Sequence, residues 1–183
     1  MAIATDQEFS ASLARATPLR GWALAMSGHE EEGITQSRQG LAASQAMGDR
    51  PYHLALLAEA SVQGGQTTEG LEALADALGT LTQSEMRWWE AELYRLRGAL
   101  LLQGTVTQPE EAEACCHQAL AVARRQQAKS LELRAVTSLS RLWQHQGKRA
   151  EARQLLEEIY GWFTEGFDTP DLQEARALLE TLT

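Results

Sequence analysis

The few residues of this sequence that could do chemistry have a spacing that argues against catalysis. A zinc-protease helix needs two histidines four residues apart around a general-base glutamate. His29 and Glu30 supply only the first part of that pattern, because Gly33 stands where the second histidine is needed. The glutamates that follow His29 fit the first turn of a helix, where negative charge complements the helix dipole.

A second candidate, the run Cys115-Cys116-His117, has the residue types of a thiol nucleophile or a metal ligand. Consecutive helical side chains diverge by about 100°, so these three cannot converge on one atom. Adjacent cysteines rarely pair, because the ring that they would close is strained. We therefore interpret both as reduced, structural thiols, and with His53 and His145 scattered we expect no catalytic, cofactor or metal site.

The five tryptophans are the strongest candidates for binding rather than catalysis. Trp143 is expected in the core, and Trp162 with Phe163 is expected to pack the last helix pair against a final helix. Of Trp88 and Trp89, which start a helix and point to different faces, one should be core and the other exposed. Trp22 is either core or a half-exposed anchor, a role in which tryptophan is common.

Composition indicates the elements that must position these residues. Strong helix formers dominate, only four prolines occur, and no segment alternates as a strand would. The net charge of -9 and the pI near 5.0 disfavour nucleic acid and anionic membrane as partners. The amino terminus lacks the regions of a signal peptide and no apolar run could span a bilayer, so a cytoplasmic location is expected.

A small residue that follows a helix end recurs every 37 to 42 residues, at Gly33, Gly70, Ala112 and Ala152. Small side chains let two antiparallel helices approach closely. We expect one all-α domain over 1–183, with repeat units 7–47, 51–82, 85–127 and 131–165 and a cap at 171–181. The expected helices are 7–27, 30–47, 51–64, 67–82, 85–103, 109–127, 131–146, 148–165 and 171–181. Gly48, Gly79, Gly104 and Gly147 should end helices, Thr107 to Glu110 should form a capping box, and Thr169 should be an N-cap.

This pattern resembles the tetratricopeptide repeat (TPR) family at Leu57-Ala58, at Tyr94 with Gly98, and at Leu139-Ser140 with Trp143. The resemblance implies an α-solenoid of about four antiparallel helix pairs with a concave binding face. Residues 85–183, above all 87–98 and 161–175, are also similar to the C-terminal repeats of bacterial class III adenylate or guanylate cyclase–ATPase fusion proteins and of related ATP-dependent transcriptional activators. That resemblance implies a C-terminal regulatory part or a stand-alone copy. No phosphate-binding G-x-x-x-x-G-K-[ST] loop exists, so ATPase or cyclase activity is not carried over.

Carrying the repeat register over predicts the residues of the concave face. They are Trp22, Met26, Tyr52, Glu59, Gln63, Glu92, Arg95, Gln103, Arg134, Arg141, Gln144 and His145. Arginine forks bind carboxylates, so Arg95, Arg134 and Arg141 could hold an acidic segment of a partner. The alternative is that these arginines form ordinary salt bridges with Glu92 and Glu132.

The function that the sequence favours is a non-catalytic protein-interaction or regulatory module. Its partner would be a protein or peptide, or the upstream domains of a parent signalling protein. Three alternatives stay open: a small-molecule sensor that uses Trp22 and Tyr52, an oligomerisation module, and a helical enzyme. The sequence does not decide the oligomeric state.

Overall fold

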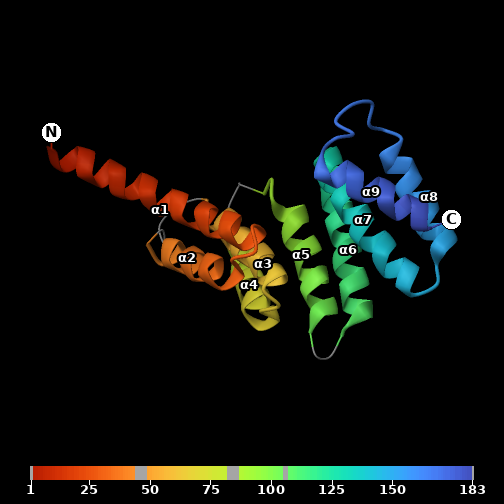
Figure 1. Ribbon diagram of the computed structural model, residues 1–183, viewed down its shortest axis with the longest axis horizontal. Helices are drawn as coiled ribbons and strands as arrows, with labels where there is room; N and C mark the ends of the chain where they lie inside the picture. The colour runs from red at the N-terminus through yellow and green to blue at the C-terminus, as the bar shows by residue number, and fades with distance from the viewer. Residues whose placement is uncertain (1, 44–48, 82–86, 105–106, 183) are drawn as a thin grey trace. The chain divides into compact units, whose positions relative to one another are not determined.

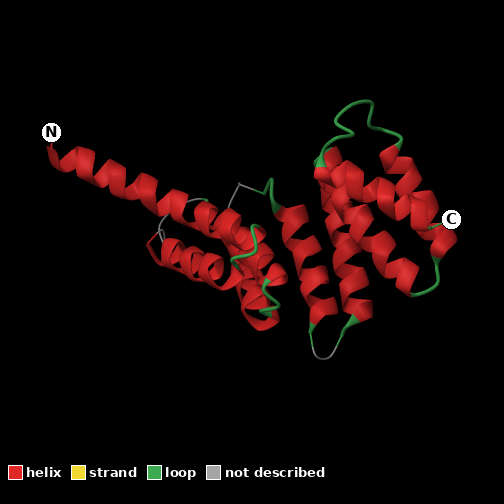
Figure 2. Cartoon of the chain, in the orientation of Figure 1, coloured by secondary structure: helices red, strands yellow, loops and turns green. Residues whose placement is uncertain are grey.

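The computed structural model describes residues 2–43, 49–81, 87–104 and 107–182, and in these ranges it contains helices and loops without strands (Figures 1 and 2). The helices of the described ranges are α1 (Ala2–Met26), α2 (Glu30–Ala43), α3 (Arg50–Gln63), α4 (Thr67–Leu81), α5 (Glu90–Gln103), α6 (Pro109–Arg125), α7 (Lys129–His145), α8 (Arg149–Tyr160) and α9 (Pro170–Thr181). The expected all-α class is confirmed, and each expected helix has its counterpart here. None of these helices is both long and apolar enough to cross a bilayer.

The chain forms two compact units. The N-terminal unit comprises Met1–Trp89 with Gln103–Thr105, and the C-terminal unit comprises Glu90–Leu102 with Val106–Thr183. In the N-terminal unit, α1 packs on α2 and α3 packs on α4, while α3 also lies against α1 and α2. In the C-terminal unit, α7 lies against α6 and α8, and α9 closes onto α7 and α8.

The small residues at the four repeat positions are all buried, as predicted. Ala112 and Ala152 are fully inaccessible, and Gly33 of α2 lies directly against Gly21 of α1. Two glycines facing each other remove the side chains that would hold the helix axes apart, so the backbones themselves come into contact. The sequence rule therefore identifies buried positions, and at Gly33 it identifies a backbone contact between two paired helices.

Each unit buries its own apolar side chains around these contacts. In the N-terminal unit the inaccessible side chains include Ile34 and Leu74. In the C-terminal unit one cluster joins Leu133, Val136 and Leu156 to apolar residues of α9, so α9 covers the end of the repeat stack as a cap.

Several predicted helix ends need correction. Gly147 does follow α7 with a positive φ of 81°, and Gly104 is the C-cap of α5, but Gly79 lies inside α4. Thr107 does not begin a capping box, because Gln108 is the N-cap of α6 and makes no side-chain capping bond. Thr169 is the N-cap of α9 as predicted, yet its hydroxyl donates backwards to the Gly166 carbonyl. Gly48 lies outside the described residues.

The tryptophan predictions have mixed outcomes. Trp162 is 58% exposed, so its predicted packing against the cap is wrong, whereas Phe163 does contact the C-terminal core. Trp143 packs against that core but is only partly buried, because its indole N–H must reach the Glu113 carboxylate at 2.7 Å. Trp88 is exposed, as expected for one of its pair, and Trp89 is partly buried.

Candidate functional site

The predicted binding residues divide between the two units. Trp22, Met26, Tyr52, Glu59, Gln63 and Gln103 belong to the N-terminal unit, and Glu92, Arg95, Arg134, Arg141, Gln144 and His145 belong to the C-terminal unit. The structure brings together subsets of each group, and those subsets differ in character.

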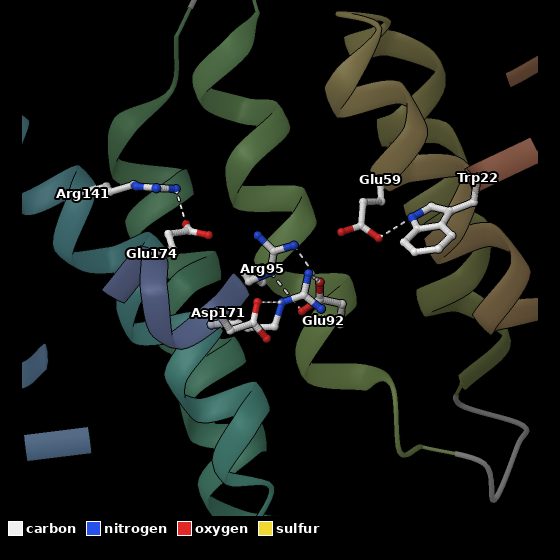
Figure 3. Close-up of polar contacts among 8 residues, drawn as sticks. Trp22, Glu59, Glu92, Arg95, Arg141, Asp171 and Glu174 are labelled. Atoms are coloured by element: carbon white, nitrogen blue, oxygen red, sulfur yellow. Dashed lines mark hydrogen bonds and ion pairs between the residues drawn. The ribbon is translucent and has the colours of Figure 1, made fainter. Parts of the chain in front are cut away.

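In the N-terminal unit, Trp22 of α1 and Glu59 of α3 form a direct pair. The indole Nε1–H donates to Oε2 of Glu59 at 2.8 Å, and the contact is partly buried. Figure 3 shows the indole nitrogen turned toward the carboxylate. This bond fixes where the negative charge of Glu59 lies.

Tyr52 extends this pair along α3. It precedes Glu59 by seven residues, about two helical turns, which places both side chains on one face. Burial raises the pKa of the Tyr52 hydroxyl, and the negative charge of Glu59 raises that pKa further. The hydroxyl therefore lies within electrostatic reach of the carboxylate.

The Tyr52 ring also meets two indoles from the segment that precedes α5. Its centroid lies 5.4 Å from that of Trp88 and 5.4 Å from that of Trp89, and the two indoles are 5.1 Å apart. Trp88 is 53% exposed. We call Trp22, Tyr52, Glu59, Trp88 and Trp89 the aromatic–acidic cluster.

The base of this cluster contains a buried histidine next to Tyr52. His53 is 2% exposed, and its Nδ1 lies 4.0 Å from Oδ1 of Asp49 without a hydrogen bond. Burial lowers the pKa of His53; the charge of Asp49 raises it and that of Arg15 lowers it further. Burial therefore favours the neutral form of His53, and a side chain only 2% exposed is placed for packing rather than for proton transfer with a substrate.

Met26 and Gln63 follow Trp22 and Glu59 by one helical turn each, and both are exposed. Neither side chain is part of the aromatic–acidic cluster, so they extend the same two helix surfaces without adding a charge. Gln103 is also exposed, near the end of α5.

In the C-terminal unit, the predicted arginines meet carboxylates of the same unit. Arg95 donates to both oxygens of Glu92, at 2.9 and 2.6 Å, and Arg134 lies 3.0 Å from Glu92 Oε1. The Glu92 side chain is only 1% exposed. Arg134 Nε also lies 3.8 Å from Oδ1 of Asp171, a residue of α9. A buried carboxylate requires such partners, because desolvating an unpaired charge is costly.

The third arginine is paired in the same way. Arg141 of α7 lies 2.5 Å from Glu174 of α9. Glu132, which was the other expected partner of these arginines, is instead held by Arg124 and Lys129, so that part of the prediction is wrong. The three predicted arginines thus face Glu92, Asp171 and Glu174, an arrangement that balances their charge.

The remaining C-terminal candidates play smaller parts. Gln144 donates to the Thr181 hydroxyl of α9 at 2.8 Å, and His145 is exposed at the end of α7. Together with the ion pairs of Arg134 and Arg141, the Gln144 bond fastens α9 to α7.

The groups suited to bond chemistry are poorly placed for it. Burial raises the pKa of both thiols, that of Cys116 to about 12, so neither is a ready nucleophile. Within the described ranges, no group of three or more His, Cys, Asp or Glu side chains could hold a metal ion.

A hollow of about 750 Å³ lies at the start of α4, bordered by Arg38, Glu69 and Glu72 together with Gln66 and Gln103. Its lining does not include Trp22 or Tyr52. The small-molecule alternative, which used those two aromatics, therefore gains no support from this hollow.

One polar arrangement escaped the sequence reasoning. Glu113 of α6 accepts from the Trp143 indole, from Gln146 at 3.1 Å and from Lys148 at 3.2 Å. Trp143, whose predicted place was the core, was the only hint of this arrangement. The choice of Glu113 as its acceptor depends on how α6 and α7 meet, and spacing along one helix does not encode that.

Comparison with known proteins identifies the fold. No family model matches the chain, and no curated protein matches it either. Among solved structures, a Podosopora anserina kinesin light chain with nearly identical TPR-like repeats is 18% identical, covers 93% of this chain and 85% of its own, and superposes with a TM-score of 0.69. A single-residue variant of that protein gives 18% identity, 93% coverage of both chains and a TM-score of 0.67. The resemblance to cyclase–ATPase proteins receives no support from these matches; what they show is that the chain has a TPR-like repeat fold.

Proposed function

We propose that this chain is a non-catalytic protein-interaction module and that it binds a segment of a partner protein at the aromatic–acidic cluster. The observation that carries the proposal is the gathering of Tyr52, Trp88 and Trp89 at centroid distances of 5.1 to 5.4 Å, with Trp88 53% exposed. Tryptophan and tyrosine dominate the binding energy of protein interfaces, because they offer large rigid surfaces with a polar tip.

The arginines of the C-terminal unit are the competing site, and their environment favours a structural role. An acidic partner segment would have to compete with Asp171 and Glu174, which are carried by a helix whose Leu172 and Ala175 are buried in the core. We therefore assign Arg134 and Arg141 to the attachment of α9.

A second part of the proposal concerns the kind of protein to which this chain would belong. On the strength of the sequence resemblance over 85–183, the chain would be the C-terminal regulatory part of a bacterial signalling protein of the cyclase–ATPase type, or a stand-alone copy of it. A partner bound to the aromatic–acidic cluster would then bias the attached domains through contact alone.

Affinity capture with quantitative mass spectrometry tests the site. The wild-type chain, Trp88→Ala and Trp162→Ala are immobilised side by side; Trp162 is the matched control, an indole 58% exposed in the other unit. Both variants remove an exposed ring, so circular dichroism should show unchanged helicity.

We expect partners retained by the wild-type chain and by Trp162→Ala to be lost from Trp88→Ala. If the Trp88 variant retains them and Arg134→Ala with Arg141→Ala loses them, the arginine site is the interface and our assignment is wrong.

A further inference from the structure

The turn between α6 and α7 keeps a side chain where three similar turns have glycine. The turns α1–α2, α3–α4, α6–α7 and α7–α8 each span three residues, and the last residue donates to the carbonyl five positions before it at 2.9 to 3.0 Å. The middle residue has a positive φ in all four turns, and in three of them it is Gly28, Gly65 or Gly147. In the α6–α7 turn it is Gln127, with a φ of 54°, the one non-glycine residue of the described ranges in that conformation.

This left-handed backbone is unfavourable for glutamine, because a β-carbon at positive φ crowds the following carbonyl oxygen. A methyl group added at Gly28, Gly65 or Gly147 would meet nothing within 4 Å, so glycine is needed there for the backbone conformation and not for space. Strained backbone of this kind concentrates at binding sites. The Gln127 side chain is therefore the first indication of such a site.

Gln127 borders a hollow of about 500 Å³ that lies within the C-terminal unit. The lining also includes Arg124, Lys129, Glu132, Leu155 and Glu158. Arg124 belongs to the last turn of α6, Lys129 and Glu132 to the first turn of α7, and the other two share one face of α8. Pockets of roughly 300–1,000 Å³ are typical of small-molecule sites.

Two cations of the lining meet on one buried carboxylate. Arg124 Nε donates to Glu132 Oε1 at 2.8 Å, and Lys129 Nζ donates to Oε2 at 2.6 Å. Burial raises the pKa of Glu132, but the bonds from Lys129 and Arg124 lower that pKa by more, so the carboxylate is ionised. These three groups leave one positive charge in excess. The terminal nitrogens of Arg124 bond to no protein atom within the described residues, so they are available to a ligand.

The same hollow offers a negative charge and apolar surface. The Glu158 side chain is exposed, and in the part of the chain that the structure describes it has no ion pair or hydrogen bond. The Lys129 ammonium lies 5.8 Å from the centre of the Trp162 ring, which is 58% exposed. An exposed indole therefore lies beside the lining, and Leu155 adds a half-buried aliphatic side chain.

This combination suits a small zwitterion better than a simple ion. A ligand carboxylate can pair with the terminal nitrogens of Arg124, and a ligand ammonium can pair with Glu158. The Gln127 amide can both donate and accept a hydrogen bond. A ligand that is only an anion is repelled by Glu158, and one that is only a cation is repelled by Arg124 and Lys129.

We propose that this hollow binds an α-amino acid whose apolar or aromatic side chain contacts Leu155 and Trp162, and that the strained Gln127 is kept because its amide bonds to the ligand. The proposal goes beyond the interaction module and does not depend on the aromatic–acidic cluster. It gives the C-terminal unit a small effector of its own.

Nuclear magnetic resonance on the full chain tests the proposal with L-phenylalanine and L-leucine as probes. Two analogues of phenylalanine each lack one charge: 3-phenylpropanoate has no ammonium and 2-phenylethylamine has no carboxylate. The indole N–H signal of Trp162 reports the hollow, and that of Trp22 reports the other unit. We expect L-phenylalanine or L-leucine to shift the Trp162 signal in a saturable manner, and each analogue to bind at least about fivefold more weakly than L-phenylalanine.

Two glutamate variants separate the site from the overall field. Glu158→Gln removes a carboxylate without a partner in the described residues, so the fold should be unaffected while amino-acid binding weakens about fivefold or more. Glu151→Gln is an equal charge loss on the same helix, exposed and outside the lining, and it should change binding less than about twofold.

Two variants at Gln127 separate ligand binding from backbone strain. Both Gln127→Ala and Gln127→Gly remove the amide, so both should weaken amino-acid binding about fivefold or more. Only the glycine variant relieves the positive φ, so its thermal midpoint should be higher than that of the alanine variant.

The absence of a saturable Trp162 shift with either amino acid would overturn the proposal. So would binding of either single-charge analogue as tight as that of L-phenylalanine, equal effects of Glu158→Gln and Glu151→Gln, or full affinity in both Gln127 variants. None of these measurements involves Trp88 or partner capture, so failure here leaves the proposed interaction module standing, and loss of that module leaves the amino-acid site standing.

Discussion

The contact between Gly33 and Gly21 provides the sharpest test of how the fold is held together. A methyl group added at Gly33 would meet the carbonyl oxygen of Gly21 and would come within 2.6 Å of the Ala25 amide nitrogen and 2.9 Å of the Ala25 Cβ. These atoms belong mainly to the backbone of α1, so the clash cannot be relieved by a rotamer change. The two helices must move apart, which loosens the packing around the contact.

The same substitution has the opposite effect at Gly79. This glycine lies inside α4, and a methyl group added there would have nothing within 4 Å. Alanine is a better helix former than glycine, so Gly79→Ala should stabilise the chain by about 0.5–1 kcal/mol. Gly33→Ala gains the same helix preference but adds an overpacking cost of about 1–3 kcal/mol at a backbone contact, so we expect a net loss of up to about 2.5 kcal/mol.

Thermal and urea unfolding followed by circular dichroism at 222 nm measures the difference. Both glycines belong to the N-terminal unit, so both variants report the same transition. The two variants differ by the overpacking cost of about 1–3 kcal/mol, and in a chain of this size about 2–4 °C corresponds to 1 kcal/mol, so the two midpoints should be separated by roughly 2–12 °C. A Gly33→Ala variant as stable as Gly79→Ala would show that α1 and α2 do not meet through their backbones, and the small-residue account of the repeat would be wrong.

Four further outcomes follow from the buried polar groups. Burial lowers the pKa of His53 below its ordinary 6.5, so as pH falls the imidazole is protonated in the unfolded chain before it is protonated in the folded chain. The urea midpoint should therefore fall as pH drops below about 6.5, and it should fall less in the His53→Gln variant. Because burial raises the pKa of both thiols, Cys115 and Cys116 should react with iodoacetamide at pH 8 rapidly only in denaturant, as mass spectrometry would show. Arg134→Met should lower the free energy of unfolding in urea by about 1–3 kcal/mol, a moderate loss because the buried Glu92 still pairs with Arg95. Adding Glu92→Gln removes the buried charge and should recover part of that loss. Glu59→Gln should lower the pKa of Tyr52 in ultraviolet titration, because it removes a neighbouring negative charge.

Much of the helical architecture was accessible from the sequence, because it depends on local signals. The repeated small residues predicted which surfaces come together, and Gly147 and Thr169 marked helix ends through their own backbone preferences. The errors lie where tertiary contacts override those signals. The expected helix 148–165 ends at Tyr160, and the chain turns there so that Phe163 reaches the core.

The candidate site was only partly predictable for a related reason. The repeat register assigned Trp22, Tyr52 and Glu59 to one predicted binding face, since it reports which helix face each one occupies. It could not show that the indole of Trp22 bonds to Glu59, because the two residues are 37 positions apart and meet only through the packing of α1 on α3. It also placed neither Trp88 nor Trp89 beside Tyr52, since a turn before a helix follows no periodic rule.

The arginines show why an equal pattern can carry opposite meanings. An arginine row on a repeat helix is the signature of an acidic ligand site, and it is equally what a buried glutamate requires for its own solvation. The two cases differ in the burial of the acid opposite the row, which one sequence does not report. Glu92 is 1% exposed and pairs with Arg95 and Arg134, so here the arginines stabilise a buried acid of the fold. Glu59, in contrast, accepts from the indole of Trp22 at a contact that is only partly buried, so the two acids differ in burial, which the sequence pattern does not report.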